Sequence, residues 1–164
     1  MISQILIEMN IIKTFLSLIG LSTCQFINNV IFPHRPVYIS KLISDEHRES
    51  IHIAMDQLAL KETENKTENH IRIQYDNYNG GGVLMTASSH TDGYFEVYQT
   101  VIGMNRMLDI FMFQCVVLHE LCHSYGLGHT DYGIMKPIIN FTENYCHLSI
   151  FDIINLYDAG FYAA

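Results

Sequence analysis

Residues 119–129 read His-Glu-Leu-Cys-His-Ser-Tyr-Gly-Leu-Gly-His, and this segment constrains the fold more than any other part of the chain. His119 and His123 are four positions apart, so on an α-helix their side chains lie on one face, about 40° apart around the axis. The eight residues before them contain no Gly or Pro, which favours a helix there. Gly126 can take the left-handed conformation that commonly ends a helix, and the chain can then return His129 to the same face. The segment therefore predicts a helix, a tight turn and three converging imidazoles.

Three imidazoles can hold one Zn²⁺ and leave its fourth coordination position to water, which is typical of a catalytic zinc site. Such an ion lowers the pKa of its water to about 7 and polarises a carbonyl. Glu120 follows the first histidine directly, so its carboxylate is placed to act as a general base beside the metal. The pattern predicts His119, His123 and His129 as zinc ligands and Glu120 as the catalytic base. Hydrolysis of a peptide bond is the reaction that suits this arrangement.

Two other interpretations of these histidines stay open. They can be packed in the core without a metal, or they can form a structural zinc site closed by a fourth ligand such as Cys122 or Cys146, which would exclude water. The pattern fixes five residue types, so a chance match is on the order of one in a million per position. The core interpretation is therefore the weakest of the three.

Size and charge narrow the remaining possibilities. The chain has 164 residues, which suits a single domain, and 49% of them are hydrophobic, enough for a core. Its formal net charge is −8, with only nine Lys and Arg residues scattered along it. A nucleic-acid partner needs clustered basic residues, so none is expected.

The N-terminus has the order of an export signal. Lys13 precedes the apolar run 14–21, and small residues follow at 22–24. This run is shorter than the roughly 20 residues that span a bilayer, so no stable membrane span is expected. We expect residues 1–24 to be a signal peptide and residues 25–164 to be the secreted domain. The alternatives are an N-terminal core helix and an uncleaved segment that anchors the chain to a membrane.

Cysteine spacing leaves the redox state open. Cys115 and Cys122 are seven positions apart on the predicted helix, about 10 Å along its axis, which is too far for a disulfide between them. Cys146 can pair with one of them, or all three can be buried thiols. Asn65 and Asn140 each begin an Asn-x-Thr triplet, which fits export but also arises by chance.

The pattern along the chain is α+β in character. Val, Ile, Tyr and Phe cluster in short stretches typical of strands, separated by Gly-rich or polar turns. Ser149 and Asp152 have the spacing of a helix N-cap and its reciprocal acid. The expected strands are 37–40, 71–75, 83–87 and 94–98, with turns at 77–82 and 88–93. The expected helices begin at Ser44 or Asp45, at Asn105 or Asp109, and at about Ile150.

The extended motif at 119–129 resembles that of the metzincin zinc peptidases. Residues 132–137, Tyr-Gly-Ile-Met-Lys-Pro, look like the methionine turn that follows it in this class, with Met135 as a hydrophobic floor below the zinc. Pro two residues after Met is most similar to matrixins, and residues 149–157 resemble the closing helix of that family. Residues 25–164 are thus expected to form a metzincin-like catalytic domain.

The resemblance implies a fold and a substrate. The fold is a twisted mixed β-sheet with a helix across it, a zinc-binding helix, a methionine turn and a C-terminal helix. Metzincins bind an extended peptide antiparallel to an edge strand of the sheet, and the matching segment here is 83–87. A hydrophobic specificity pocket is expected between the zinc helix and the loop 136–147. The expected partner is therefore a protein or peptide substrate.

Some residues depart from the matrixin pattern. The segment 77–94 is too short for the family's structural zinc and calcium loops, and His90 alone does not rebuild them. We therefore expect one catalytic Zn²⁺ and neither structural Ca²⁺ nor a second Zn²⁺. Cys122 replaces a small residue and is expected to be buried. The tyrosine ligand of astacins, two residues after Met135, is absent, and Cys24 lacks the flanking residues of a zinc-blocking latency segment.

Residues near the motif carry less specific expectations. Asp131 can hydrogen-bond within the turn or support a ligand, and Tyr125 and Tyr132 can line the cleft or pack. The remaining histidines are expected at the surface or in loops rather than as ligands: His34, His47, His52, His70, His90 and His147.

The sequence thus predicts a zinc-dependent endopeptidase that uses a zinc-activated water with Glu120 as general base. The alternative is a catalytically inactive zinc-binding domain of the same fold that recognises proteins. An intact Glu120 counts against that alternative, because recognition alone does not need its carboxylate.

Overall fold

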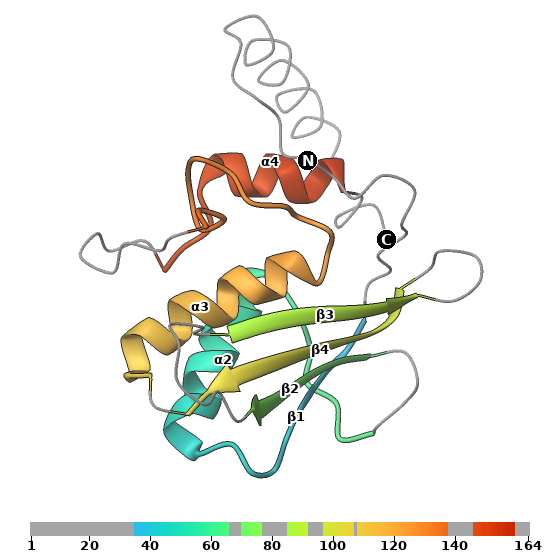
Figure 1. Ribbon diagram of the computed structural model, residues 1–164, viewed down its shortest axis with the longest axis vertical. Coiled ribbons are helices and arrows are strands. Elements are labelled where there is room, and N and C mark those ends of the chain that lie inside the picture. Colours follow the sequence, from blue (N-terminus) through green and yellow to red (C-terminus); the bar gives the residue numbers. More distant parts are fainter. Residues whose placement is uncertain are drawn as a thin grey trace, which may run out of the picture.

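The computed structural model describes residues 35–65, 70–76, 85–91, 97–106, 108–137 and 146–159. Its elements follow the order β1 (Val37–Ile39), α2 (Asp45–Gln57), β2 (His70–Asp76), β3 (Met85–Thr91), β4 (Val97–Asn105), α3 (Ile110–His123) and α4 (Ile150–Asp158), which confirms the α+β class (Figure 1). The expected signal peptide, 1–24, lies outside the described residues. Among those described, no helix is both long and apolar enough to cross a membrane.

The strands form one mixed sheet in the order β1-β2-β4-β3. β1 pairs in parallel with β2, and β2 in parallel with β4, so that Ile71 lies between Val37 and Thr100. β3 pairs antiparallel with β4 and ends the described sheet on that side. A single antiparallel edge strand beside three parallel strands follows from the chain order, because β3 and β4 are joined directly while β1 and β2 are joined through α2.

Strand boundaries differ from those expected. The turn predicted at 88–93 is wrong in its first half, because β3 continues to Thr91. The strand predicted at 94–98 is described from Val97 and extends to Asn105. Residues 83–84 and 94–96 lie outside the described part of the chain. The polar run 88–91 is a poor strand former alone, but its backbone completes a ladder with β4, and pairing of this kind overrides local propensity.

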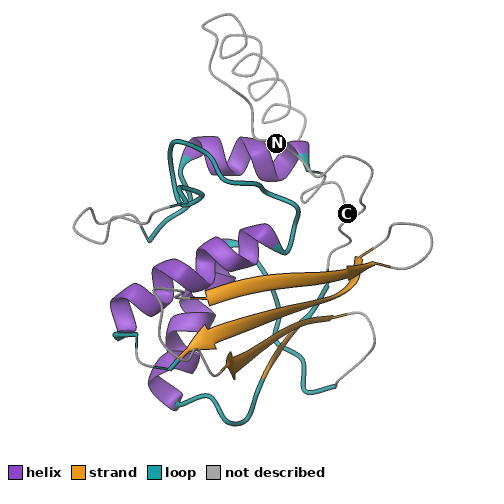
Figure 2. Cartoon of the chain, in the orientation of Figure 1, coloured by secondary structure: helices purple, strands orange, loops and turns teal. Residues whose placement is uncertain are grey.

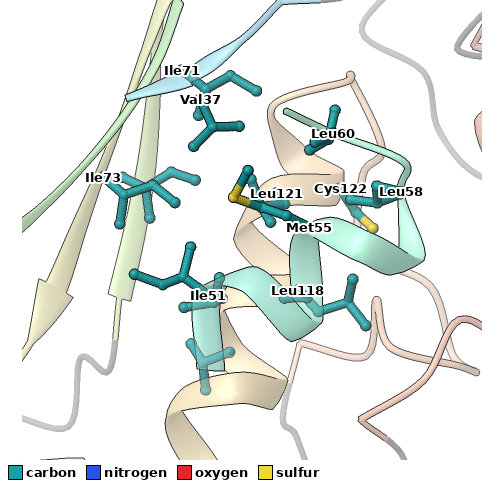
Figure 3. Packing of buried hydrophobic residues seen from close by; sticks show 14 of the residues in the cluster. Val37, Ile51, Met55, Leu58, Leu60, Ile71, Ile73, Leu118, Leu121 and Cys122 are labelled. Atoms are coloured by element: carbon teal, nitrogen blue, oxygen red, sulfur yellow. The ribbon is translucent and has the colours of Figure 1, made fainter. Parts of the chain in front are cut away.

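Two helices cover the sheet, and the core lies between them and the strands. Figure 3 shows Ile73 from β2 facing Ile51 and Met55 of α2, with Leu118 and Leu121 of α3 completing the layer. All five are at most 3% exposed. Burying side chains of this size gains roughly 1.5–3 kcal/mol each. This packing fixes α3 against the sheet, and α3 carries His119 and His123.

Helix starts follow the sequence closely. Ser44 caps α2, and its side chain accepts a hydrogen bond from the backbone N–H of His47. Asp109 caps α3 by accepting from Met112. The predicted capping box at Ser149 and Asp152 is confirmed at the start of α4. Each cap satisfies a backbone N–H that the helix leaves unpaired.

A disulfide between Cys115 and Cys146 ties α3 to the segment before α4. Gln57, at the end of α2, holds the same segment: its Nε2 donates to Cys146 O at 2.9 Å, and its Oε1 accepts from Leu148 N at 3.0 Å. Cys122 is buried, as expected, and takes no part in the disulfide. The spacing left Cys146 free to pair with either cysteine of α3, and in the fold it pairs with Cys115.

Candidate metal site

The three histidines of the motif lie together in space. One ring nitrogen of each of His119, His123 and His129 lies within 4.8 Å of the other two. The helix places the first two, whose ring centroids are 4.6 Å apart. Gly126 has φ +83°, a backbone conformation that is unfavourable for residues with a side chain. It turns the chain so that His129 comes back beside the first two histidines. The predicted helix, turn and convergence are thus all present.

Backbone carbonyls set the orientation of two of these rings. His119 Nδ1 lies 2.7 Å from Ile134 O, and His123 Nδ1 lies 2.6 Å from Leu127 O. A carbonyl can only accept a hydrogen bond, so each Nδ1 carries the hydrogen and each Nε2 keeps its lone pair. His123 Nε2 lies 3.2 Å from His129 Nε2. This is the arrangement that commonly orients imidazole ligands of a metal, and a single Zn²⁺ fits the donor set.

Burial keeps the rings neutral. The pKa of His119 is lowered from 6.5 to about 4, chiefly because the ring is removed from water. The hydrogen bond to Ile134 O opposes this shift, and the neighbouring imidazoles add to it. Burial also lowers the pKa of His123. At neutral pH both rings are therefore deprotonated at Nε2, and a cation does not have to displace protons from them.

Glu120 follows His119 on α3 and is only 7% exposed. Its position next to the first histidine of the group matches the position that the sequence motif assigns to the general base. Its role in catalysis stays a prediction.

The turn after the third histidine is built on α4, and sequence analysis missed this connection. Asp152 is fully buried, and its Oδ2 accepts from Ser149 N at 2.8 Å and from Ile134 N at 3.2 Å. The carbonyl of the same Ile134 accepts from His119. Gly133 has φ +64°, and a Cβ there would clash with the carboxylate of Asp152. The capping-box spacing predicted the bond of Asp152 to its own helix, but not its bond to Ile134.

Hydrogen bonds within the loop close this turn. Thr130 N donates to Met135 O at 2.9 Å, and Thr130 Oγ1 donates to Tyr132 O at 2.6 Å. Met135 is fully buried, as the methionine-turn resemblance implies. Figure 2 shows the loop that leaves α3 and runs toward α4 through these residues. These hydrogen bonds within the turn are made by Thr130, the neighbour of Asp131.

Two tyrosines near the motif pack rather than stand free in a cleft. Tyr125 is 1% exposed. The ring of Tyr132 lies 4.9 Å from that of Phe151 on α4.

Two histidines expected at the surface are buried. His47 stacks on Phe113 at 3.8 Å between ring centroids, and its Nδ1 lies 2.7 Å from the hydroxyl of Tyr75. The ring of His70 meets Tyr38 edge-on at 6.1 Å. That expectation was wrong because both rings sit on core-facing positions of α2 and β2. His147 is exposed, as expected.

The chain has an α+β fold in which three histidines converge at the end of a helix. Comparison with solved structures finds a similar fold. No known protein-family profile matches the chain, and no curated protein sequence matches it. The structure is similar to that of high choriolytic enzyme 1, a hatching enzyme zinc-protease from Oryzias latipes (medaka fish). The TM-score is 0.54 at 13% identity, over 87% of this chain and 99% of the fish enzyme. At that identity the likeness shows a shared fold.

Proposed function

We propose that the chain is a zinc-dependent endopeptidase that hydrolyses peptide bonds in protein substrates. The observation that carries this proposal is the three-histidine group, in which carbonyl partners turn the Nε2 atoms of His119 and His123 toward His129. Three protein ligands leave a position for water, as in catalytic rather than structural zinc sites. The fold shared with a zinc-protease supports the same activity.

In the proposed reaction, a zinc ion held by these imidazoles would supply Lewis acidity and lower the pKa of the attacking water. Glu120 takes a proton from that water as its oxygen bonds to the substrate carbonyl carbon. The same carboxyl group then gives the proton to the amine nitrogen as the C–N bond breaks. Glu120 is largely buried, so the surroundings screen its negative charge less than water would. Its attraction for the proton of the water is therefore stronger.

The mode of substrate binding is proposed from the matrixin resemblance. An extended peptide would pair antiparallel to the edge strand β3, with a side chain entering a hydrophobic pocket between α3 and the loop 136–147. Two observations are compatible with this mode: β3 is the last strand of the described sheet, and α3 contacts it. The matrixin-like subtype itself rests on the sequence of the methionine turn and of α4.

We also propose that the protein is secreted after removal of residues 1–24. Lys13 and the apolar run 14–21 carry this proposal. A disulfide is compatible with an oxidising compartment. Expression of the complete chain in a secreting host, followed by N-terminal sequencing of the exported protein, tests it. Retention of the uncleaved chain in the membrane fraction would favour the anchored alternative.

The second candidate function is a zinc-binding recognition domain without activity. The buried carboxylate at Glu120 argues against it, because recognition does not require that group. A zinc site closed by Cys146 is disfavoured, since this sulfur is bonded to Cys115.

Digestion of a mixed peptide library tests the proposed activity. The purified protein is assayed with and without a zinc chelator, beside the Glu120→Ala variant. We expect cleavage that requires both the metal and Glu120, with the variant retaining zinc but losing at least about 10²-fold in rate, the low end for loss of a general base. Equal activity in the variant would reject the assigned base. A folded protein with one bound zinc and no cleavage would favour the recognition domain.

A further inference from the structure

Arg35 is a fully buried cation at the back of the helix that carries the histidines. It directly precedes the Pro36 that leads into β1, and it has 0% exposure. Its Nη2 donates to Thr100 Oγ1 on β4 and to Ser124 O, each at 2.9 Å. Ser124 is the C-cap of α3 and follows His123. One guanidinium nitrogen thus links the sheet to the end of the zinc helix.

The charge of Arg35 is costly, and the helix end offsets part of the cost. Burial lowers its pKa from 12.5 to about 10, so the group stays charged at neutral pH. Its Nε and Nη1 have no hydrogen-bond partner in the part of the chain that the structure describes. The carbonyls at a helix C-terminus carry partial negative charge, which favours a cation placed there. The guanidinium is therefore held at Ser124 by both a hydrogen bond and the field of α3.

The turn that Arg35 holds is also the turn that orients His123. The chain runs from Ser124 through Gly126 to Leu127, whose carbonyl accepts from His123 Nδ1 at 2.6 Å. Leu127 N in turn donates to Cys122 O at 3.3 Å. A shift of the Ser124 carbonyl would move this short turn, and with it the acceptor that fixes the ring of His123.

We propose that Arg35 is a positioning residue for the metal site, which braces the turn behind His123 and His129 from the sheet. This inference rests on the proposed function, because it assumes that the three histidines bind a metal. It predicts that loss of Arg35 changes the geometry and the affinity of the metal site, beyond any effect on folding. Loss of outer partners of a metal ligand typically lowers affinity 10–100-fold.

The test uses Co²⁺ as the probe, because its visible absorption reports the geometry of the coordination site. The full chain is compared with Arg35→Met, which removes the charge and all donors, and with Arg35→Lys, whose ammonium can still reach one or both acceptors. Thr100→Val removes the acceptor on the sheet. Arg48→Met is the matched control. Arg48 lies on α2, on the side away from the site, and pairs with Glu62 at 2.6 Å. Co²⁺ affinity, the absorption spectrum and metal-free melting are measured for each.

We expect Arg35→Met to lower Co²⁺ affinity about 10-fold and to change the spectrum, with partial recovery in Arg35→Lys. Thr100→Val cuts the link from Arg35 to the sheet, so it should change the spectrum in the same direction but by less. Arg48→Met should keep the spectrum of the parent. Unchanged affinity and spectrum in Arg35→Met, even with a lower melting temperature, would overturn the inference and leave Arg35 a structural residue. If Arg35→Met does not fold, a parental spectrum and affinity in Thr100→Val would overturn it, because the turn would then not depend on the link to the sheet. A parent chain that binds no Co²⁺ would instead reject the metal site itself.

Discussion

At the scale of residues, the site depends on which nitrogen of each histidine is free. The carbonyls of Ile134 and Leu127 fix the rings of His119 and His123. His129 is exposed, and no carbonyl orients its ring in the part of the chain that the structure describes. The third histidine of the group therefore comes from a loop, and its position depends on the turn at Gly126. This division explains why the site needs both a helix and a helix end.

Replacement of His129 by Ala should leave the protein folded and weaken zinc binding by more than roughly 100-fold, because a ligand is worth more than the outer partner of one. His147→Ala is the matched control, since this histidine is exposed and lies outside the three-histidine group. Competition against a chelator of known affinity measures both variants. Parental affinity in His129→Ala would mean that the third ligand lies elsewhere.

The lowered pKa of His119 predicts a pH dependence of stability. Between pH 6.5 and about 4 the unfolded chain binds a proton at this ring and the native protein does not. The free energy of unfolding of the metal-free protein should therefore fall as the pH drops through this window, by about 3 kcal/mol for a shift of this size. Urea unfolding in a chelator at several pH values measures this dependence. His119→Gln should show a smaller slope than the parent in the same window, and an equal slope would contradict the assignment.

At the scale of elements, α4 supports the metal site from outside the motif. Asp152 closes the capping box of its own helix and also accepts from Ile134, the residue whose carbonyl orients His119. The two uses can be separated, because Ser149 takes part only in the first. A single carboxylate thus couples the start of a helix to the orientation of a ligand.

Substitutions of Ser149 and Asp152 should therefore differ in whether they lower stability alone or also weaken zinc binding. Ser149→Ala should lower stability by about 1 kcal/mol, as loss of an N-cap does, and leave zinc affinity unchanged. Asp152→Ala should lower stability further and also weaken zinc binding about 10-fold, because the Ile134 turn loses its acceptor. Denaturant unfolding of the metal-free proteins and chelator competition measure the two effects. Equal zinc affinity in both variants would show that α4 does not support the site.

The sequence predicted helices better than strands, for a physical reason. Caps such as Ser44 and Ser149 are local signals, since the side chain bonds to a backbone N–H three residues away. The polar end of β3 has no local signal, because it is stabilised by pairing with β4, which lies further along the chain. The convergence of the three histidines followed from spacing alone. Asp152 and Arg35 reach the site over distances in sequence that spacing does not encode.

At the scale of the whole molecule, α3 is the element to which the others attach. Its inner face packs on α2 and the sheet, its C-terminal end is held by Arg35, and its first half is bonded to Cys146. The sulfur link lies two turns before His123, so it secures the helix without touching the ligands. Stability and metal binding should therefore respond differently when this link is removed.

The disulfide closes a loop with a sequence separation of 31 residues. In the chain-entropy account, a loop of this length stabilises the folded state by about 3–4 kcal/mol. We expect the Cys115→Ser/Cys146→Ser double variant to lose stability of this order while its zinc affinity stays within about threefold of the parent, because the carbonyl partners of His119 and His123 lie on the loop after α3. Gln57 should keep the segment before α4 in place, since its two hydrogen bonds to that segment do not involve sulfur. Urea unfolding and chelator competition provide the measurements, with Cys122→Ala as the control for loss of a buried thiol on the same helix. A large loss of zinc affinity in the double variant would mean that the first half of α3 sets the geometry of the site, against the division of roles inferred here.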